Sequence, residues 1–452
     1  MPKLEAWFLG GVLQRLLQSE FDPRKSRAVL ERMNGRVASP VLRPQCVGDG
    51  GMVLEEEALF PEQGAWQLQF HAPEAAWHTE VPPDVLPSIA HFLRLATHGE
   101  ELQGLREAWP FLEEEGLGLL HLTPAPRVCW PTPDTPGIYR REHASLLIRS
   151  RTTSILVDPV SLDRRMPQMS EAPVHLPSQG VDAVAITHGH GDHWHLPSLL
   201  THLATPDTPV LVPRLPRISL LTPQHFEASL RACGQAVLTP AWGETVKVGD
   251  IEIDILPFYG EQPAREGPPL KAGLRNWGNC YRFTTEDFSC VLLVDGGTDP
   301  EGSMDRVMAE SHARRGPVDV LLACQREFPS PFFGGLSDIW AALPWEQLQG
   351  LYLDYVAGRM KNTTAGITGI ADACGIARAR YFLAYANGFQ GLGRPILDIG
   401  WGSREPSEAT SNARLREQLA ARALPTQVPE WCPGDVARFS RGQLLLERLP
   451  PR

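Results

Sequence analysis

Residues 185–195 have the sequence AITHGHGDHWH. The apolar run predicts a buried strand that ends at Thr187, and the next six residues supply four potential metal ligands: His188, His190, Asp192 and His193. Successive side chains of an extended chain point to opposite faces, so His-x-His places two imidazoles on one side. Gly189 and Gly191 allow a tight backbone path, which turns the Asp-His pair toward a second metal. The stretch therefore predicts a metal site; the alternative is a histidine-rich surface loop without metal.

The sequence on either side of this motif alternates β-rich runs with helical stretches. The predicted strands are short apolar runs, at 143–150, 153–160, 181–188, 209–213, 245–258, 279–285, 289–297, 318–324, 348–355 and 380–386. The predicted helices are amphipathic stretches between them, at 196–202, 223–232, 303–314 and 367–374. Strands and helices in this order favour an α+β protein in which two sheets pack together and helices cover them.

The chain is long enough for more than one folding unit. Its 452 residues predict two or more domains, or one elaborated domain with an appendage. Residues 123–137, TPAPRVCWPTPDTPG, are so dense in proline that they predict a linker. We therefore expect an N-terminal α/β domain of unassigned role at 1–135 and a catalytic domain with a C-terminal extension at 136–452. Helices are predicted in the first part at 86–95 and 102–115.

Composition and charge narrow the range of partners. The net charge of −11 argues against nucleic acid, because binding to phosphates needs a concentrated basic surface. No apolar run is long enough to predict a membrane span. The N-terminal stretch has an early acid, Glu5, and no small-residue cleavage site, so it predicts a packing helix and not a signal peptide. The eight cysteines form no CxxC pair, which indicates reduced thiols and a cytoplasmic location.

The motif HGHGDH at 188–193 matches, position for position, the HxHxDH signature of the metallo-β-lactamase superfamily, which the chain resembles. Residues 141–160 resemble the first hairpin of that fold, and LLVDGGTD at 292–299 resembles the later strand that ends in a metal-bridging aspartate. The resemblance implies an αββα sandwich over roughly 138–400 and leaves the N-terminal third unexplained.

The resemblance also implies roles for the ligands. His188 and His190 would bind the first metal, Asp192 and His193 the second, and Asp295 would bridge them. The alternative for Asp295 is a turn residue before two glycines. The bridging role is favoured because an unpaired carboxylate at the end of a buried strand is costly.

At the remaining ligand positions this chain differs from the hydrolytic members of the superfamily, which usually have two further histidines there. The only histidines after His193 are His195, His202, His225 and His312. The first abuts the motif, and the others lie in predicted helices where surface or packing roles are favoured. At the third-ligand position stands Glu261, whose alternative is an acid in a surface loop; near the expected last histidine stand Tyr385 and Asn387.

A site with three histidines and several carboxylates favours iron over zinc. Glutamate in place of the third histidine is similar to the diiron oxygenase branch, the β-hydroxylase of chloramphenicol biosynthesis and its relatives, which act on amino acids tethered to carrier proteins. Further residues predicted to lie around the ligands are His143, Gln325, Glu327, Asp354 and Tyr385.

Three functions follow as hypotheses. The first is a diiron oxygenase with O2 as co-substrate, a small or carrier-tethered substrate and an electron donor as partner, with Asp295 and Glu261 as its catalytic residues. The second is a dizinc hydrolase of an ester, lactone, amide or phosphodiester, which uses a bridging hydroxide. The third is a binding module with a degenerate metal site. A homodimer is left open by the sequence.

Overall fold

The computed structural model describes residues 44–47, 51–54, 65–71, 76–98, 129–130, 135–141, 143–160, 176–177, 180–219, 222, 224–260, 275–327, 359, 362–387, 407–440 and 443–448. Two large sheets form its centre, one of eight and one of six strands. Both sheets mix antiparallel hairpins with parallel strands.

The strands of the larger sheet lie in the order β12 (Val237–Leu238), β11 (Val210–Leu211), β10 (Ala183–Ala185), β8 (Ser154–Val157), β7 (Leu146–Arg149), β6 (Gly137–Arg140), β21 (Asp435–Ser440) and β22 (Gln443–Arg448). From β8 to β12 the pairing is parallel, and from β8 through β7 and β6 to β21 and β22 it is antiparallel.

The strands of the smaller sheet lie in the order β13 (Thr245–Val248), β14 (Ile251–Pro257), β15 (Asn279–Thr284), β16 (Ser289–Val294), β19 (Val320–Ala323) and β20 (Tyr381–Ala384). The last three strands are parallel, so residues that follow them gather at one edge of the sheet. Asp295 follows β16, and Tyr385 follows β20.

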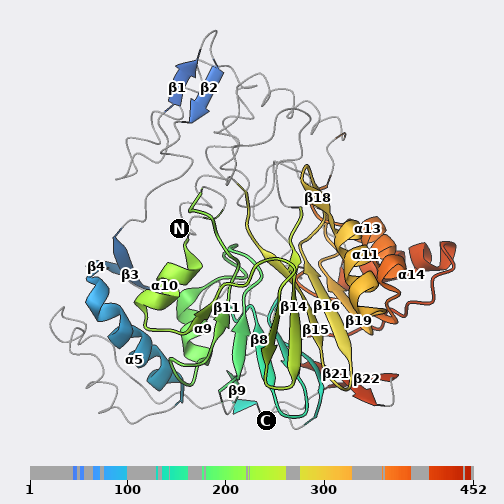
Figure 1. Cartoon of the computed structure of the whole chain (residues 1–452), viewed down its shortest axis with the longest axis horizontal. Helices are drawn as coiled ribbons and strands as arrows, with labels where there is room; N and C mark the ends of the chain where they lie inside the picture. The colour runs from blue at the N-terminus through green and yellow to red at the C-terminus, as the bar shows by residue number, and fades with distance from the viewer. Residues whose placement is uncertain are drawn as a thin grey trace.

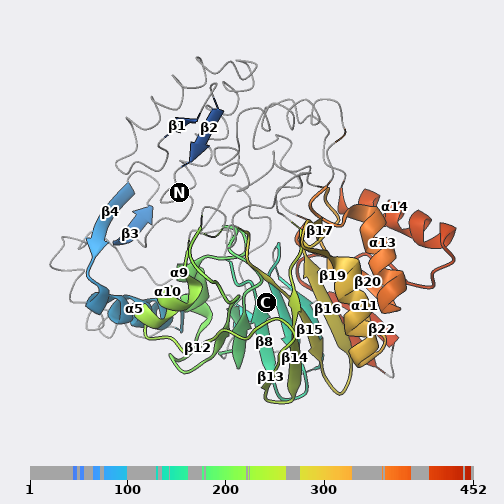
Figure 2. The same cartoon turned by 45° about the horizontal axis from the view of Figure 1, so that its top comes forward.

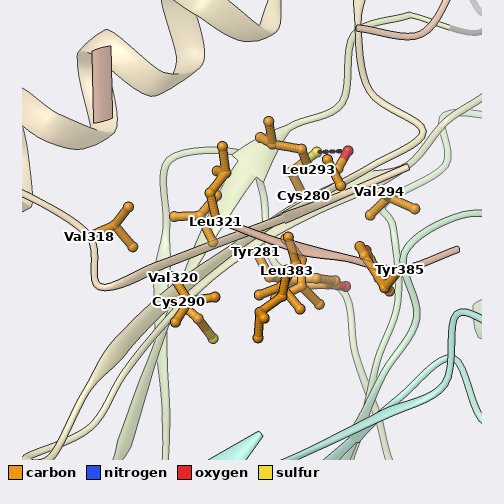
Figure 3. Close-up of a cluster of buried hydrophobic side chains, with 14 of the residues drawn as sticks. Cys280, Tyr281, Cys290, Leu293, Val294, Val318, Val320, Leu321, Leu383 and Tyr385 are labelled. Carbon is orange, nitrogen blue, oxygen red and sulfur yellow. Dashed lines mark hydrogen bonds between the residues drawn. The ribbon is translucent and has the colours of Figure 1, made fainter. Parts of the chain in front are cut away.

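Alternating side chains divide the core into layers, because successive residues of a strand face opposite sides. Leu146 and Ile148 of β7 belong to the cluster between the sheets, whereas Leu147 faces the other way, into a second cluster with helices. Figure 3 shows part of the first cluster, with side chains from strands of the smaller sheet. Burial of each such side chain contributes about 1.5–3 kcal/mol.

Helices cover both outer faces. On the larger sheet lie α5 (Leu86–His98), α9 (Leu196–His202) and α10 (Phe226–Ala232); on the smaller sheet lie α11 (Met304–Arg315), α13 (Gly366–Ala377) and α14 (Glu408–Ala421). Figures 1 and 2 show these two helical layers on opposite sides of the paired sheets. The chain therefore has an α+β fold with αββα layers, and the predicted fold class is confirmed.

The segment after residue 407 is part of the same fold. Strand β21 pairs with β6, and α14 docks through a buried ion pair in which Arg140 Nη1 lies 2.7 Å from Glu408 Oε1. Trp431 packs against the Arg140 guanidinium at 5.3 Å. This segment thus extends the larger sheet instead of forming a separate unit.

In the N-terminal region the described residues include two hairpins and two consecutive helices. The hairpins join β1 (Pro44–Val47) to β2 (Gly51–Leu54) and β3 (Trp66–His71) to β4 (Ala76–Val81). A short helix, η2 (Pro83–Val85), leads into α5, whose Ile89 and Phe92 pack in the second cluster. The domain boundary near residue 135 stays a prediction.

Two small two-stranded sheets remain. They pair β5 (Cys129–Trp130) with β9 (Leu176–Pro177), and β17 (Thr298–Asp299) with β18 (Gly302–Ser303). Among the helices of the described ranges, none has the length and apolar character needed to cross a membrane.

Candidate metal centre

The metal motif lies at a junction between the two sheets. His188 follows β10 of the larger sheet and forms an antiparallel bridge with Gly278, just before β15 of the smaller sheet. The next residue, Asn279, donates its backbone N–H to Thr187 O at 2.7 Å. A Cβ on Gly278 would lie 2.9 Å from the Phe258 ring and 3.0 Å from His188 Cβ, so only glycine permits this close approach.

Two overlapping groups of side chains bring potential ligand atoms together: His188, His193 and Asp295 in one, and His143, Asp192 and His193 in the other. Within each group these atoms lie within 4.8 Å of one another. Asp295 Oδ2 is 3.6 Å from His188 Nε2 and 3.3 Å from His193 Nε2. Asp192 Oδ2 is 3.0 Å from His143 Nε2 and 4.0 Å from His193 Nε2. The residues therefore offer two adjacent metal positions.

Asp158, which sequence reasoning did not single out, orients the imidazoles. Its buried carboxylate accepts hydrogen bonds from His193 Nδ1 at 2.8 Å, from Thr187 Oγ1 at 2.6 Å and from Thr187 N at 2.8 Å. Because a carboxylate only accepts, His193 Nδ1 holds the proton and Nε2 keeps its lone pair. Thr187 Oγ1 donates to Asp158, so at 3.1 Å it accepts from His188 Nδ1. One carboxylate thus sets the tautomer of both histidines.

His190 lies beside the first group without belonging to either group of ligand atoms in the described structure. Its ring is 4.6 Å from the His188 ring, at an interplanar angle of 73°. Its Nε2 lies 3.3 Å from Asn276 Nδ2, and on the other side the His188 ring stacks on Phe258 at 5.3 Å. The motif therefore brings His190 next to His188, at the edge of the first group of ligand atoms.

Burial and nearby charges shift the pKa values of the three imidazoles in different directions. Burial lowers the pKa of His188 well below its usual range, and it also lowers the pKa of His190. Burial acts to lower the pKa of His193. Nearby carboxylates, among them Asp192 and Asp158, outweigh burial and raise this pKa well above its usual range. His188 and His190 are thus neutral, as metal ligands must be, whereas protons compete with metal at His193.

The carboxylates accumulate negative charge in the site. Asp158 is fully buried, the Asp295 side chain is 8% exposed, and the Asp192 side chain is 31% exposed. Burial acts to raise the pKa of Asp192, but the imidazoles of His193 and His143 outweigh it, so that the pKa falls well below its usual range. Together with the carboxylates of Asp158 and Asp295, Asp192 concentrates acidic groups around the imidazoles, which favours a cation at this position.

Backbone strain is concentrated around the same residues. Six non-glycine residues of the described chain have positive φ, and four of these lie in or next to the site: His143 (48°), Asp158 (41°), Val294 (56°) and Ala386 (54°). Such conformations cost about 1–3 kcal/mol each and persist where the surrounding fold imposes them, often at functional sites. Val294 precedes Asp295, and Ala386 follows Tyr385.

The donor set fits metal ions. His193 Nε2 and Asp295 Oδ1 are buried and have no hydrogen-bond partner within the described ranges. A buried polar atom without a partner costs about 1–3 kcal/mol. Imidazole nitrogens and carboxylate oxygens are the usual ligands of zinc and of non-haem iron, so a metal ion would satisfy both atoms.

Other predicted residues have different positions. Glu261 and Asp354 lie outside the described residues. Gln325 donates through Nε2 to Asn412 at 2.9 Å and thus joins the network that docks α14, while the exposed Glu327 packs near Gly366. Neither Gln325 nor Glu327 is among the grouped ligand atoms of the described chain.

A buried ion pair fixes Arg275 and Gly260, the described residues on either side of positions 261–274. Arg275 donates to Phe258 O at 3.0 Å and to Asp299 Oδ2 at 2.5 Å, and Asp299 Oδ2 also accepts from Gly260 N at 3.0 Å. Gly260 has a φ of +103°, and a Cβ there would lie 2.3 Å from Thr363 O, so glycine is required. Glu261 is bonded directly to this fixed residue.

The family match identifies the motif-bearing region. Residues 153–322 match the family model described as the beta-lactamase superfamily domain. The resemblance predicted from the HGHGDH motif is thereby confirmed. No curated protein matches the chain.

Two solved structures share the fold over most of the chain. One is the diiron beta-hydroxylase CmlA from Streptomyces venezuelae, with 19% identity, a TM-score of 0.52, and coverage of 84% of this chain and 65% of that one. The other is a mutant of the CmlA beta-hydroxylase, with 18% identity, a TM-score of 0.54, and coverage of 80% and 63%. The chain thus spans less than two thirds of either length. An isothiocyanate hydrolase from Delia radicum gut bacteria matches at 14% identity and a TM-score of 0.41, covering 67% of this chain and 98% of that one. At these identities the first two likenesses establish the fold alone.

Proposed function

We propose that the chain is a dinuclear non-haem iron oxygenase that hydroxylates, or otherwise oxidises with O2, a small or carrier-tethered substrate. His188 and His190 would hold the first metal together with Glu261. Asp192 and His193 would hold the second, and Asp295 would contact both. His143, which the sequence predicted as an outer contact, would complete the second position because its Nε2 lies within that group of ligand atoms.

The positions of the four histidines after His193 support iron over zinc. His195 Nδ1 lies 2.7 Å from Ser198 Oγ at the start of α9, and His202 Nδ1 lies 2.7 Å from Ser198 O. His225 caps α10 by accepting from Ala228 N at 3.2 Å, and His312 lies within α11. Since these are the only histidines after His193, neither of the two later ligand positions of the hydrolases can hold a histidine from this part of the chain, and the carboxylate of Glu261 would complete the first position. A carboxylate in place of an imidazole favours iron. The fold shared with a protein described as a diiron beta-hydroxylase supports the same choice.

A bound iron pair supplies the redox chemistry that couples reduction of O2 to oxidation of substrate. Hydroxylation with O2 also consumes two electrons and two protons and releases water, so an electron donor is a required partner. The chain itself holds the ligands in position: Asp158 and Thr187 keep the ligating imidazoles in one tautomer, and Phe258 packs against His188. The surrounding core excludes water from the His188 and His193 rings, which are 0% and 1% exposed.

Metal content and colour test this proposal. The protein would be expressed with iron supplied, and iron and zinc per chain would be measured beside the visible spectrum. Two irons per chain and near-ultraviolet absorption are expected. The variant His193→Ala should lose metal, whereas the matched variant His195→Ala, two residues away and outside the ligand groups, should retain it. Stoichiometric zinc in a colourless protein that cleaves an ester or lactone would instead establish the hydrolase.

A further inference from the structure

Tyr385 places a buried hydroxyl beside the metal centre. It follows β20, the neighbour of β19, which in turn pairs with the strand that ends at Asp295. Figure 3 shows Tyr385 at the same end of the hydrophobic cluster as Val294, and β19 lies between their two strands. The phenol side chain is fully buried, and burial, followed by the negative charges of Asp158 and Asp295, raises the pKa of Tyr385 well above its usual range.

The backbone on both sides of Tyr385 is fixed. Tyr385 N donates to Ala323 O at 3.3 Å, and Trp431 Nε1 donates to the preceding carbonyl, Ala384 O, at 2.6 Å. Ala386 has a φ of +54°, and its N–H lies 3.4 Å from His143 O. The strained Ala386, its link to His143 and the hydrogen bonds of the neighbouring backbone therefore fix the position from which the phenol side chain extends.

The Tyr385 hydroxyl shares one property with the ligand atoms. Like His193 Nε2 and Asp295 Oδ1, it is buried without a hydrogen-bond partner in the described part of the chain. Tyr281 provides a contrast, since its equally buried hydroxyl donates to Ile186 O at 2.6 Å. A buried phenol normally finds such a partner.

We propose that the Tyr385 hydroxyl is a further catalytic residue, which donates a hydrogen bond to an oxygen ligand, solvent or substrate, held by the metal next to Asp295. Such a donor stabilises negative charge on that oxygen and orients it relative to the two metal positions. The inference rests on the metal centre of the proposed function but not on the choice of iron, so it can be tested with zinc and cobalt(II).

The experiment compares Tyr385→Phe with Tyr281→Phe, each of which removes one oxygen atom and keeps the ring. Melting temperature would be measured for the metal-free and the zinc-loaded protein, zinc affinity by competition with a chromophoric chelator, and the ligand field by the visible spectrum of the cobalt(II) form. For Tyr385→Phe we expect an unchanged or higher melting temperature without metal, zinc binding weaker by about tenfold, and a shifted cobalt spectrum. For Tyr281→Phe we expect a lower melting temperature in both forms and unchanged zinc affinity.

The opposite pattern would overturn the inference. If Tyr385→Phe lowered the melting temperature of the metal-free protein while zinc affinity and the cobalt spectrum stayed those of the wild type, the hydroxyl would have a structural partner. A wild-type protein that binds no zinc or cobalt would overturn the metal centre itself. The two failures are therefore distinguishable.

Discussion

The substitution Asp158→Asn should weaken metal binding without removing any ligand. The Asp158 carboxylate is an acceptor for His193 Nδ1 and Thr187 Oγ1, which in turn accepts from His188. An asparagine that keeps its oxygen toward Thr187 N directs an amide N–H at both partners. The imidazole of His193 then favours the tautomer with its proton on Nε2, where the metal should bind.

The expected loss of metal affinity follows from the role of Asp158, which hydrogen-bonds to a ligand and does not itself bind the metal. Replacement of such an outer partner typically weakens metal binding by about 10- to 100-fold, which corresponds to about 1.4–2.7 kcal/mol. Thr187→Val removes only the connection to His188 and leaves the hydrogen bond to His193, so its effect should lie near the lower end, at about tenfold. Asp182→Asn is a matched control, because this exposed carboxylate accepts from Ser154 N at 2.7 Å, away from the ligands.

The assay is titration of metal-free protein with zinc in competition with a chromophoric chelator, with circular dichroism to establish that each variant is folded. We expect the order wild type and Asp182→Asn, then Thr187→Val, then Asp158→Asn, from tightest to weakest. Binding by folded Asp158→Asn within twofold of the wild type would refute the role given to this carboxylate.

Three further predictions concern metal choice, stability and pH. Glu261→His should shift metal selection toward zinc, measured as the iron-to-zinc ratio after expression in a medium with both; an unchanged ratio would remove Glu261 from the ligand set. Glu408→Gln should lower the free energy of unfolding in urea by about 3–5 kcal/mol, because it leaves the buried Arg140 charge without its partner, whereas the exposed pair variant Glu310→Gln should lower it by less than about 1 kcal/mol. Burial acts to raise the pKa of Asp250, but hydrogen bonds led by the one from Ser150 lower it to about 2. A carboxyl with a depressed pKa stabilises the fold above its unfolded value and loses this effect as pH falls, so the stability deficit of Ser150→Ala should be full above about pH 4 and shrink toward pH 2; a deficit that stays constant from pH 6 to pH 2 would contradict this.

The parts of the fold that sequence reasoning predicted depend on local patterns. Helix α9 was predicted at 196–202 and found as Leu196–His202, because its apolar residues repeat at helical spacing directly after the motif. The strand that ends before Asp295 was predicted from a continuous apolar run, and it is buried throughout. Such signals lie within one element and need no knowledge of its neighbours.

The parts that were not predicted depend on contacts between distant segments. Strand β21 pairs with β6, which lies almost 300 residues earlier in the sequence, and no local pattern predicts that pairing. In the sequence, Asp158 is an acid before a proline at the end of a strand, which is typical of a turn. Its role toward His193 emerges only when the first hairpin and the motif lie side by side, and the same holds for His143.

The most direct test of the dinuclear centre is anomalous diffraction at the iron absorption edge from crystals of the iron-loaded protein. We predict two peaks: one bound by His188 and His190 with Glu261, the other by Asp192 and His193 with His143. Asp295 should contact both. A single peak, or peaks away from these side chains, would contradict the account.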